Sequence, residues 1–320
     1  MACGCSGRSP AGRHRLLRRA GLLCALAMLG VAAYGAGIYQ GYRVTWPVPQ
    51  IKALVEQRVR RNGPQIDALG RLVAFPGKQA VPCPPQDAET AVLLLAGQSN
   101  AANFQGQRYQ GEGGHVINLF DGRCYLAASP LLGAGGRFGE SWTLLGNRLV
   151  AAGLYRTVIL IPVAIGGSAI RQWAAGGALN RMLLAVLRQV APRYRITAIL
   201  WQQGAADFAL GTSGPRYAAD LRSLLASLRA AGVTAPFYLC RASFQLGAAW
   251  SPDNPVALAQ AALVDGRSIR AGPDTDRDIT AFDRYDGLHF SASGEEKFAA
   301  AWLALLRAQK AADGTPHAGP

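Results

Sequence analysis

The sequence is poor in histidine and cysteine and lacks the common nucleotide-binding motifs. Of its 320 residues, 4 are histidine and 6 are cysteine, and their spacing matches no metal-binding motif. No G-x-G-x-x-G segment follows the first strand-like run, and no G-x-x-x-x-G-K-[S/T] segment occurs anywhere. These absences exclude the dinucleotide-binding and P-loop classes, and we expect neither a metal nor an organic cofactor.

Acidic residues are also few, with 19 Asp and Glu against 33 Lys and Arg, which gives a formal net charge of +14. The excess is uneven, since residues 1–61 carry +9 and residues 62–320 carry only +5. A protein that binds a phosphate backbone needs its basic groups clustered on the binding domain. We therefore expect no nucleic-acid partner. The composition, 50% hydrophobic, is that of a globular protein.

Residues 20–39 form a long run without charge, directly after five arginines. A helix of this length spans about 30 Å, the thickness of a bilayer's hydrocarbon core. A single Arg43 follows the run, so the charge bias places residues 1–19 in the cytoplasm and the rest of the chain outside. We expect a single-pass, uncleaved signal-anchor with a periplasmic or extracellular domain. Two alternatives stay open, a signal peptide cleaved after Ala33-Tyr34-Gly35 and a buried helix of a soluble domain.

The remaining chain divides by composition. Residues 40–90 are proline-rich around an amphipathic segment at 51–61 and predict a stem or linker with a short helix, and residues 310–320 predict a flexible tail. Between them, at 91–309, short apolar runs alternate with helical patterns, which predicts an α/β domain with a parallel sheet covered by helices on both faces. The apolar runs are 91–97, 156–167, 196–204 and 235–242, and the helical patterns are 180–194, 217–232 and one from 293 onward.

Three cysteines lie beyond the apolar N-terminal run, so at least one stays unpaired. Cys83 and Cys124 are candidates for a disulfide in an oxidising compartment. Cys240 lies in the apolar run PFYLC and is expected to be a small buried hydrophobic residue.

Polar or glycine-rich stretches follow three of the predicted strands, and a fourth precedes the last helix. In a parallel sheet, ligands bind at the carboxyl ends of the strands, so these stretches are candidates for the functional site. The first places Ser99 just past a strand, where a nucleophile can project. The stretches are LLLAGQSNA (93–101), AIGGSAIRQW (164–173), LWQQGAAD (200–207) and YDGLHFS (285–291).

A serine nucleophile needs a base to accept its proton and an acid to orient that base. Histidine is the usual base, and two of the four histidines lie in the terminal segments. His115 has no acid placed to orient it, whereas His289 follows Asp286 by three residues in an Asp-Gly-Leu-His turn. We therefore predict Ser99 as nucleophile, His289 as general base and Asp286 as its orienting acid.

The order of the four stretches resembles the SGNH hydrolase superfamily, in particular the sialate O-acetylesterase-like branch that includes carbohydrate esterase family 6. The matching motifs are GQSN, GGS with a following Trp, W-x-Q-G and a C-terminal D-x-x-H, and the resemblance covers residues 91–309. It implies a three-layer α/β/α sandwich with a central parallel sheet. It also implies a serine esterase that removes acetyl groups from sugars.

The resemblance assigns further roles to residues of the matching motifs. The oxyanion would be held by the backbone N–H groups of Ser99 and of Gly166 or Gly167, and by the side-chain amide of Gln203. Arg171 and Trp173 lie near the implied pocket, and Trp173 is equally well explained as a core residue. The implied substrate-binding residues are Gln98, Asn100, Gly167, Arg171 and Asp207.

One position departs from the family pattern. Ala205 stands where the family has an acidic residue after Gln-Gly, so the support of the oxyanion donor is expected to be weaker or to come from elsewhere. We predict a membrane-anchored serine esterase that removes O-acetyl groups from a carbohydrate at the cell envelope through an acyl-enzyme intermediate. Two alternatives remain: a polysaccharide O-acetyltransferase with the same triad, and a non-catalytic carbohydrate-binding protein on a degenerate esterase fold, which Ala205 favours.

Overall fold

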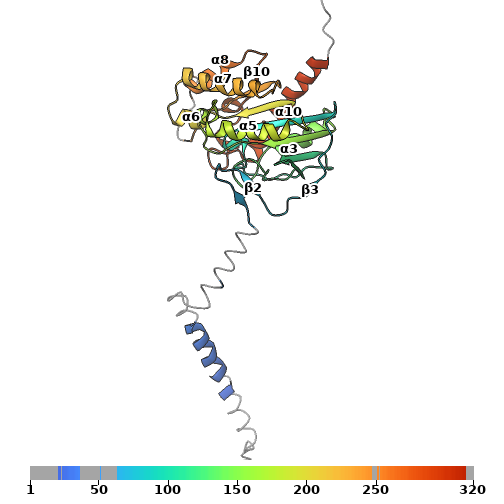
Figure 1. Cartoon of the computed structure of the whole chain (residues 1–320). Helices are drawn as coiled ribbons and strands as arrows, with labels where there is room; N and C mark the ends of the chain where they lie inside the picture. The colour runs from blue at the N-terminus through green and yellow to red at the C-terminus, as the bar shows by residue number, and fades with distance from the viewer. Residues whose placement is uncertain are drawn as a thin grey trace, which may run out of the picture. The chain divides into compact units, whose positions relative to one another are not determined.

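The computed structural model describes residues 21–22, 24–36, 51, 63–246, 251 and 253–314 (Figure 1). The chain divides into two compact units, Met1–Asn62 and Gly63–Pro320. In the first unit, residues 21–22 and 24–36 are helical. Across the described residues, no helix has both the length and the apolar character needed to span a bilayer. The predicted segment 1–19 lies outside the described residues, the predicted span 20–39 and stem helix 51–61 lie partly outside them, and all three remain predictions.

The second unit is built on an eight-stranded sheet with the order β10-β9-β8-β4-β7-β5-β6-β3. Strands β10 to β5 in that order are parallel to one another, which confirms the parallel centre of the sheet. The strands are β4 (Thr90–Gly97), β5 (Val116–Phe120), β7 (Thr157–Pro162), β8 (Ala198–Gln202), β9 (Phe237–Arg241) and β10 (Ile269–Asp274), with β6 (Arg123–Leu126) and β3 (Ala80–Val81) at one edge.

The sheet as a whole is mixed, because antiparallel strands extend the predicted parallel centre at this edge. Strand β6 pairs antiparallel with β5, and β3 pairs antiparallel with β6. The connection between β5 and β6 is Asp121-Gly122, and both residues have positive φ, 49° and 71°. A two-residue Asp-Gly turn of this kind joins antiparallel neighbours, because its twist matches that of the flanking strands.

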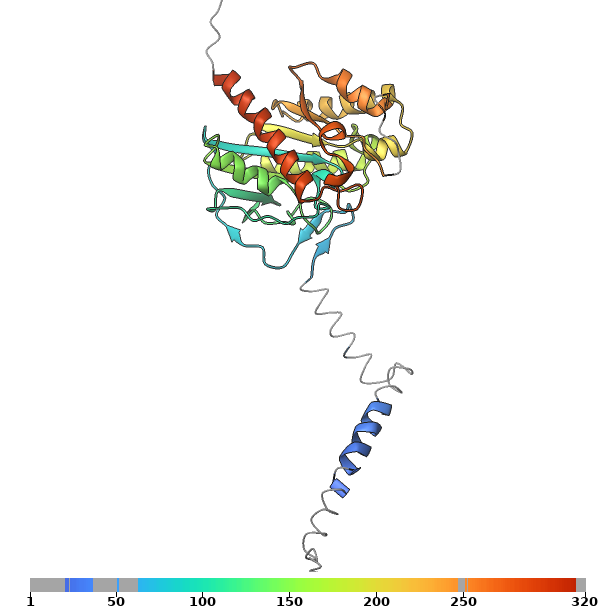
Figure 2. The same ribbon diagram turned by 180° about the vertical axis from the view of Figure 1, so that it is seen from behind.

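Helices cover both faces of the sheet, as a three-layer sandwich requires. Along β4, Val92, Leu94 and Ala96 contribute to one buried cluster, whereas the alternate residues Ala91, Leu93 and Leu95 contribute to the other. The first cluster includes residues of α5 (Ala178–Val190), α7 (Gly214–Ala230) and α8 (Pro255–Leu263), and the second includes α3 (Trp142–Ala151) and α10 (Ala292–Gly314). Helix α5 lies over one face in Figure 1, and α10 crosses the opposite face in Figure 2.

The compact unit is longer at both ends than the predicted domain 91–309. It begins at Gly63, because the hairpin of β1 (Gln65–Ile66) and β2 (Leu72–Ala74) buries Leu72 completely and because β3 joins the main sheet. Strands of two or three residues carry too little periodicity for sequence analysis to detect. At the other end, α10 continues to Gly314, so residues 310–314 of the predicted tail are helical and residues 315–320 lie outside the described residues.

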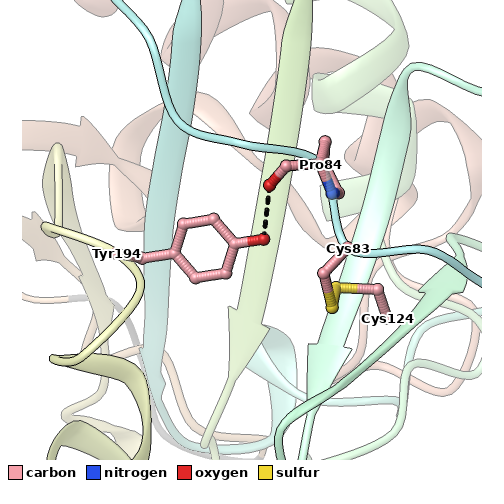
Figure 3. Close-up of a disulfide and its surroundings, with 4 residues drawn as sticks. All are labelled: Cys83, Pro84, Cys124 and Tyr194. Carbon is pink, nitrogen blue, oxygen red and sulfur yellow. Dashed lines mark hydrogen bonds between the residues drawn. A yellow bond between two sulfur atoms is a disulfide. The ribbon is translucent and has the colours of Figure 1, made fainter.

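The disulfide predicted between Cys83 and Cys124 is confirmed (Figure 3). It ties the segment after β3 to β6, and beside it the Tyr194 hydroxyl donates a 2.7 Å hydrogen bond to the carbonyl oxygen of Pro84. Cys240 is a free thiol with 0% exposure, as expected of a small core residue, and burial raises its pKa.

Replacing both Cys83 and Cys124 by serine is expected to lower the free energy of unfolding by about 4 kcal/mol, because the bond closes a loop of 41 residues that the unfolded chain would otherwise explore freely. Urea unfolding of the wild type and the double variant measures the difference. Replacing the free, buried Cys240 by alanine controls for the loss of sulfur alone. An unchanged midpoint in the double variant would contradict the expectation.

Candidate functional site

Ser99 lies at the carboxyl end of β4, after a turn that requires glycine. Gly97 has a φ of 133°, and a Cβ atom on it would lie 2.0 Å from the carbonyl oxygen of Gln202 on neighbouring β8. The chain turns from there into the 3-10 helix η1 (Ser99–Ala101). Ser99 is buried, and its hydroxyl has no hydrogen-bond partner among the described residues. The hydroxyl is therefore not committed to a structural role.

Asn100, the next residue, connects the serine to the predicted base. Its side-chain Nδ2 donates to the carbonyl oxygen of Leu288 at 3.2 Å, and its Oδ1 accepts from the backbone N–H of Phe290 at 3.1 Å. These two peptide groups lie on either side of His289. One side chain thus joins the turn that carries Ser99 to the loop that carries His289. Asn100 was predicted to bind substrate, but both ends of its amide are used for positioning.

Asp286 and His289 form the pair that their spacing predicted. Asp286 Oδ2 lies 2.6 Å from His289 Nδ1, while Oδ1 accepts from the backbone N–H groups of Leu288 and His289 at 2.9 and 2.7 Å. Burial raises the pKa of Asp286, but these hydrogen bonds outweigh burial and hold the pKa below its ordinary value. An ionised Asp286 only accepts, so Nδ1 carries the proton and Nε2 is left to accept one from Ser99.

Gly166 borders the same site from the loop that follows β7. A Cβ atom on Gly166 would lie 2.7 Å from two ring carbons of Phe104, and the Phe104 ring stacks on the His289 imidazole with centroids 5.6 Å apart. The backbone N–H groups of Gly166 and Ser99 donate to no acceptor in the described part of the chain. Both N–H groups are thus free to donate to an oxyanion, and the oxyanion role of Ser99 and Gly166 remains a prediction.

The structure contradicts the oxyanion role predicted for Gln203. This side chain is completely buried, and its amide nitrogen donates to the carbonyl oxygen of Ser168 at 3.0 Å and to Asp207 Oδ2. Its Oε1 accepts from the Tyr217 hydroxyl at 3.0 Å. Because both amide hydrogens are used inside the protein, no donor is left for a substrate. Gln203 fixes the second and third motifs to each other instead.

Two further predicted substrate contacts are also structural. Asp207 is 1% exposed and accepts from the backbone N–H of Ile170 and from the Thr212 hydroxyl, so it is out of reach of a substrate. The side-chain oxygen of Gln98 accepts from the N–H groups of Gly204 and Ala206, both at 3.1 Å. Gln98 thereby caps the start of α6 (Ala205–Ala209), which begins at the alanine that replaces the family's acid.

The other residues of the second motif divide by exposure. Trp173 is completely buried, in α4 (Ile170–Trp173), and packs edge-on against Trp201 with centroids 5.4 Å apart, so it is a core residue. Gly167 and Arg171 are exposed, and their substrate-binding role remains a prediction. Within the described residues, no group of three or more His, Cys, Asp or Glu side chains is arranged to hold a metal ion.

Arg284 is a site residue that sequence analysis missed. Its guanidinium donates to the carbonyl oxygen of Leu288 at 2.6 Å, the same oxygen that accepts from Asn100. It lies 4.1 Å from the Phe244 ring centroid and is 7% exposed. Burial lowers the pKa of Arg284 to about 10, although nearby acids, Asp286 among them, oppose the shift. A lone arginine between acidic residues looks like a surface cation, so no sequence signal marked it.

Replacing Arg284 by lysine is expected to lower kcat by about 10- to 100-fold with little change in KM. Lysine has no planar guanidinium to hold the carbonyl oxygen of Leu288, so the position of the adjacent His289 would shift. Steady-state kinetics on a soluble acetate ester tests this. Arg277→Lys, an exposed arginine on α9 (Thr275–Asp278), is the matched control and should keep full activity. Unchanged kcat in an Arg284→Lys variant that is less stable would show that Arg284 only supports the fold.

Glu295, in the first turn of α10, holds the loop that carries Phe104. Its Oε1 accepts from the backbone N–H of Gln107 at 2.8 Å. Burial raises the pKa of Glu295 to about 7, and its hydrogen bonds with Gln107 and Tyr109 only partly oppose the shift. A carboxyl this deeply buried is more stable when protonated.

Because the folded-state pKa of Glu295 lies above the unfolded value, its contribution to stability is present at low pH and is lost as pH rises to about 7. The difference in unfolding free energy between Glu295→Gln and the wild type should therefore change with pH. We expect it to shift by about 3 kcal/mol in favour of the variant as the pH rises from 5 to 8. Glutamine keeps the acceptor for Gln107 and carries no charge. Urea unfolding at both pH values measures the gain, and a difference that does not vary with pH would contradict it.

Comparisons with known proteins identify the family of this chain. A family model described as "Carbohydrate esterase, sialic acid-specific acetylesterase" matches residues 126–301, which include Gly166, Asp286 and His289. Ser99 precedes the matched segment, so its place in the site rests on the structure. No curated protein matches the sequence.

Several solved structures are similar to this chain at low sequence identity. A protein from Arabidopsis thaliana is 18% identical with a TM-score of 0.57, over 70% of this chain and 99% of its own. The acetylxylan esterase Axe2 from Geobacillus stearothermophilus is 15% identical with a TM-score of 0.46, over 68% of this chain and 94% of its own. A carbohydrate acetylesterase from Xanthomonas citri is 18% identical with a TM-score of 0.46, over 70% of this chain and 57% of its own. At 18% identity, the likeness to the Arabidopsis thaliana protein supports the fold alone.

Proposed function

Because the chain belongs to the carbohydrate esterase family of sialic acid-specific acetylesterases, we propose that it removes O-acetyl groups from a carbohydrate through an acyl-enzyme on Ser99. The protein is a carboxylic ester hydrolase by family. The observation that carries the proposed mechanism is the pair of hydrogen bonds between the Asn100 side chain and the two peptide groups that flank His289. They hold an oriented base next to an uncommitted serine.

In the first half of the reaction, His289 Nε2 accepts the Ser99 proton while Ser99 Oγ bonds to the acetyl carbonyl carbon. The carbonyl oxygen becomes an oxyanion, which the N–H groups of Ser99 and Gly166 stabilise. The intermediate collapses, the bond to the sugar oxygen breaks, and the imidazolium returns its proton to that oxygen. Asp286, kept ionised by its hydrogen bonds, stabilises the imidazolium throughout.

In the second half, water takes the place of the sugar. His289 removes a proton from water as the oxygen attacks acetyl-Ser99, a second oxyanion forms at the same two N–H groups, and acetate leaves. Ser99 recovers its proton from the imidazolium, so every group returns to its starting state. The cycle consumes one water molecule for each acetyl group released.

The proposed location is the outer side of a membrane, with residues 20–39 as a single-pass anchor and the catalytic unit in the periplasm or outside the cell. The charge bias around this segment supports the orientation. The Cys83–Cys124 disulfide supports an oxidising compartment, since such bonds persist there and are rare in the cytosol. An exported or cell-wall polysaccharide would then be the substrate.

The proposal is tested by incubating the full chain in detergent with O-acetylated polysaccharides and measuring free acetate. We expect acetate release by the wild type and none above background by Ser99→Ala. Adding an unacetylated sugar as acceptor separates the alternatives, because a transferase would move label from an acetyl donor to that sugar. Folded protein that releases no acetate from any ester would contradict the esterase mechanism.

A further inference from the structure

Tyr285 presents an exposed, fixed aromatic face beside the proposed catalytic histidine. Its side chain is 51% exposed, and its ring lies nearly parallel to the His289 imidazole, with centroids 6.2 Å apart and an interplanar angle of 28°. Its hydroxyl donates to the carbonyl oxygen of Phe104 at 3.0 Å, and a Cβ on Gly106 would lie 3.2 Å from the ring. The ring is therefore held in place, and a ligand that contacts it would not have to order it.

Leu246 lies against the same turn and is also exposed. Its side chain is 58% exposed, and a Cβ atom on Gly287 would lie 2.7 Å from Leu246 Cδ1. The turn that carries Asp286 and His289 is thus bordered by two apolar side chains that the fold leaves in water. Single exposed apolar residues are common, but two at the edges of a catalytic turn are a candidate contact surface for a ligand.

The chemistry of the two side chains selects the ligand. A pyranose ring has hydroxyl groups around its rim and C–H groups on its faces, and an aromatic face attracts such C–H groups because of its negative quadrupole. We propose that Tyr285 and Leu246 bind the apolar face of the acetylated sugar ring and so orient its ester toward Ser99. This inference rests on the proposed function and assigns the sugar contact to two residues to which sequence analysis gave no role.

The test compares two acetate esters that differ in the sugar ring. Ethyl acetate carries the same acyl group as glucose pentaacetate but has no ring, and both are followed by acetate release. For Tyr285→Ala we expect kcat/KM on glucose pentaacetate to fall about tenfold more than on ethyl acetate. Tyr285→Phe keeps the ring, so its ratio of kcat/KM on glucose pentaacetate to kcat/KM on ethyl acetate should stay within about twofold of the wild-type ratio. Leu246→Ala should lower this ratio in part. Leu258→Ala, at a similarly exposed leucine on α8, is the control.

Because the Tyr285 ring contacts His289, removing Tyr285 can slow the hydrolysis of both esters. The ratio of kcat/KM on glucose pentaacetate to kcat/KM on ethyl acetate cancels this shared effect. Equal losses on both esters in Tyr285→Ala and Leu246→Ala would overturn the proposal. A direct binding measurement distinguishes failure of the proposed sugar contact from failure of the proposed esterase function. In the inactive Ser99→Ala background, saturation transfer from protein to the ring protons of glucose pentaacetate should be strong, and adding Tyr285→Ala should abolish it. Undiminished transfer would also overturn the proposal.

Discussion

Replacing Ser99 by alanine is expected to lower kcat for acetate ester hydrolysis by about five to six orders of magnitude, and replacing His289 by alanine should cost as much. Each variant removes one half of the same proton transfer, so the surviving rate comes from the two oxyanion N–H groups and from substrate binding alone. For the same reason the double variant should be no slower than either single variant. Steady-state kinetics of the three variants measures this non-additivity.

The control is His115→Ala, which removes a histidine that has no place in the site. It should retain wild-type kcat. Losses for Ser99→Ala and His289→Ala that multiply in the double variant would show that the two residues act independently. That result would contradict a nucleophile and base working as one unit.

Replacing Asp286 by asparagine has the second largest expected effect, a fall in kcat of about four orders of magnitude. The carboxylate accepts from His289 Nδ1–H at 2.6 Å, whereas an asparagine amide can turn a donor toward that nitrogen. The imidazole would then carry its proton on Nε2 and could not accept one from Ser99. KM should change little, because Asp286 faces the base rather than the substrate.

Asp278→Asn, at an exposed aspartate on α9, is the matched control and should change kcat by less than about twofold. Thermal unfolding of both variants shows whether the turn still forms, since the side-chain oxygen of the introduced asparagine can still accept from the N–H groups of Leu288 and His289. A folded Asp286→Asn enzyme with near-normal kcat would contradict the role of Asp286 as the orienting acid.

The parts of the fold that could be predicted from sequence are those that bury long apolar runs. Strands β4, β7, β8 and β9 lie in continuous hydrophobic stretches because helices cover both faces of the central sheet. The β5–β6 hairpin has short strands, and its Asp121-Gly122 turn was the signal that could have found it. The β1–β2 hairpin carried no such signal.

The site was predictable where chemistry fixes both residue type and spacing. Asp286 and His289 met because three residues of a tight turn bring a carboxylate to a ring nitrogen. Gln203 was misassigned because a motif gives the residue but not the direction of its amide, and here Ser168 and Asp207 take both hydrogens. Asn100 and Arg284 act through backbone groups of the histidine loop, which no sequence motif reveals.

The central claim is that Ser99 is activated by His289 for attack on an ester. Labelling the protein with a fluorophosphonate and locating the adduct by mass spectrometry of peptides tests it most directly, since the reagent bonds only to an activated serine. The account predicts a single adduct on Ser99 in the wild type and none in His289→Ala under the same conditions. No adduct on Ser99 in folded wild-type protein, or equal labelling when His289 is replaced, would contradict it.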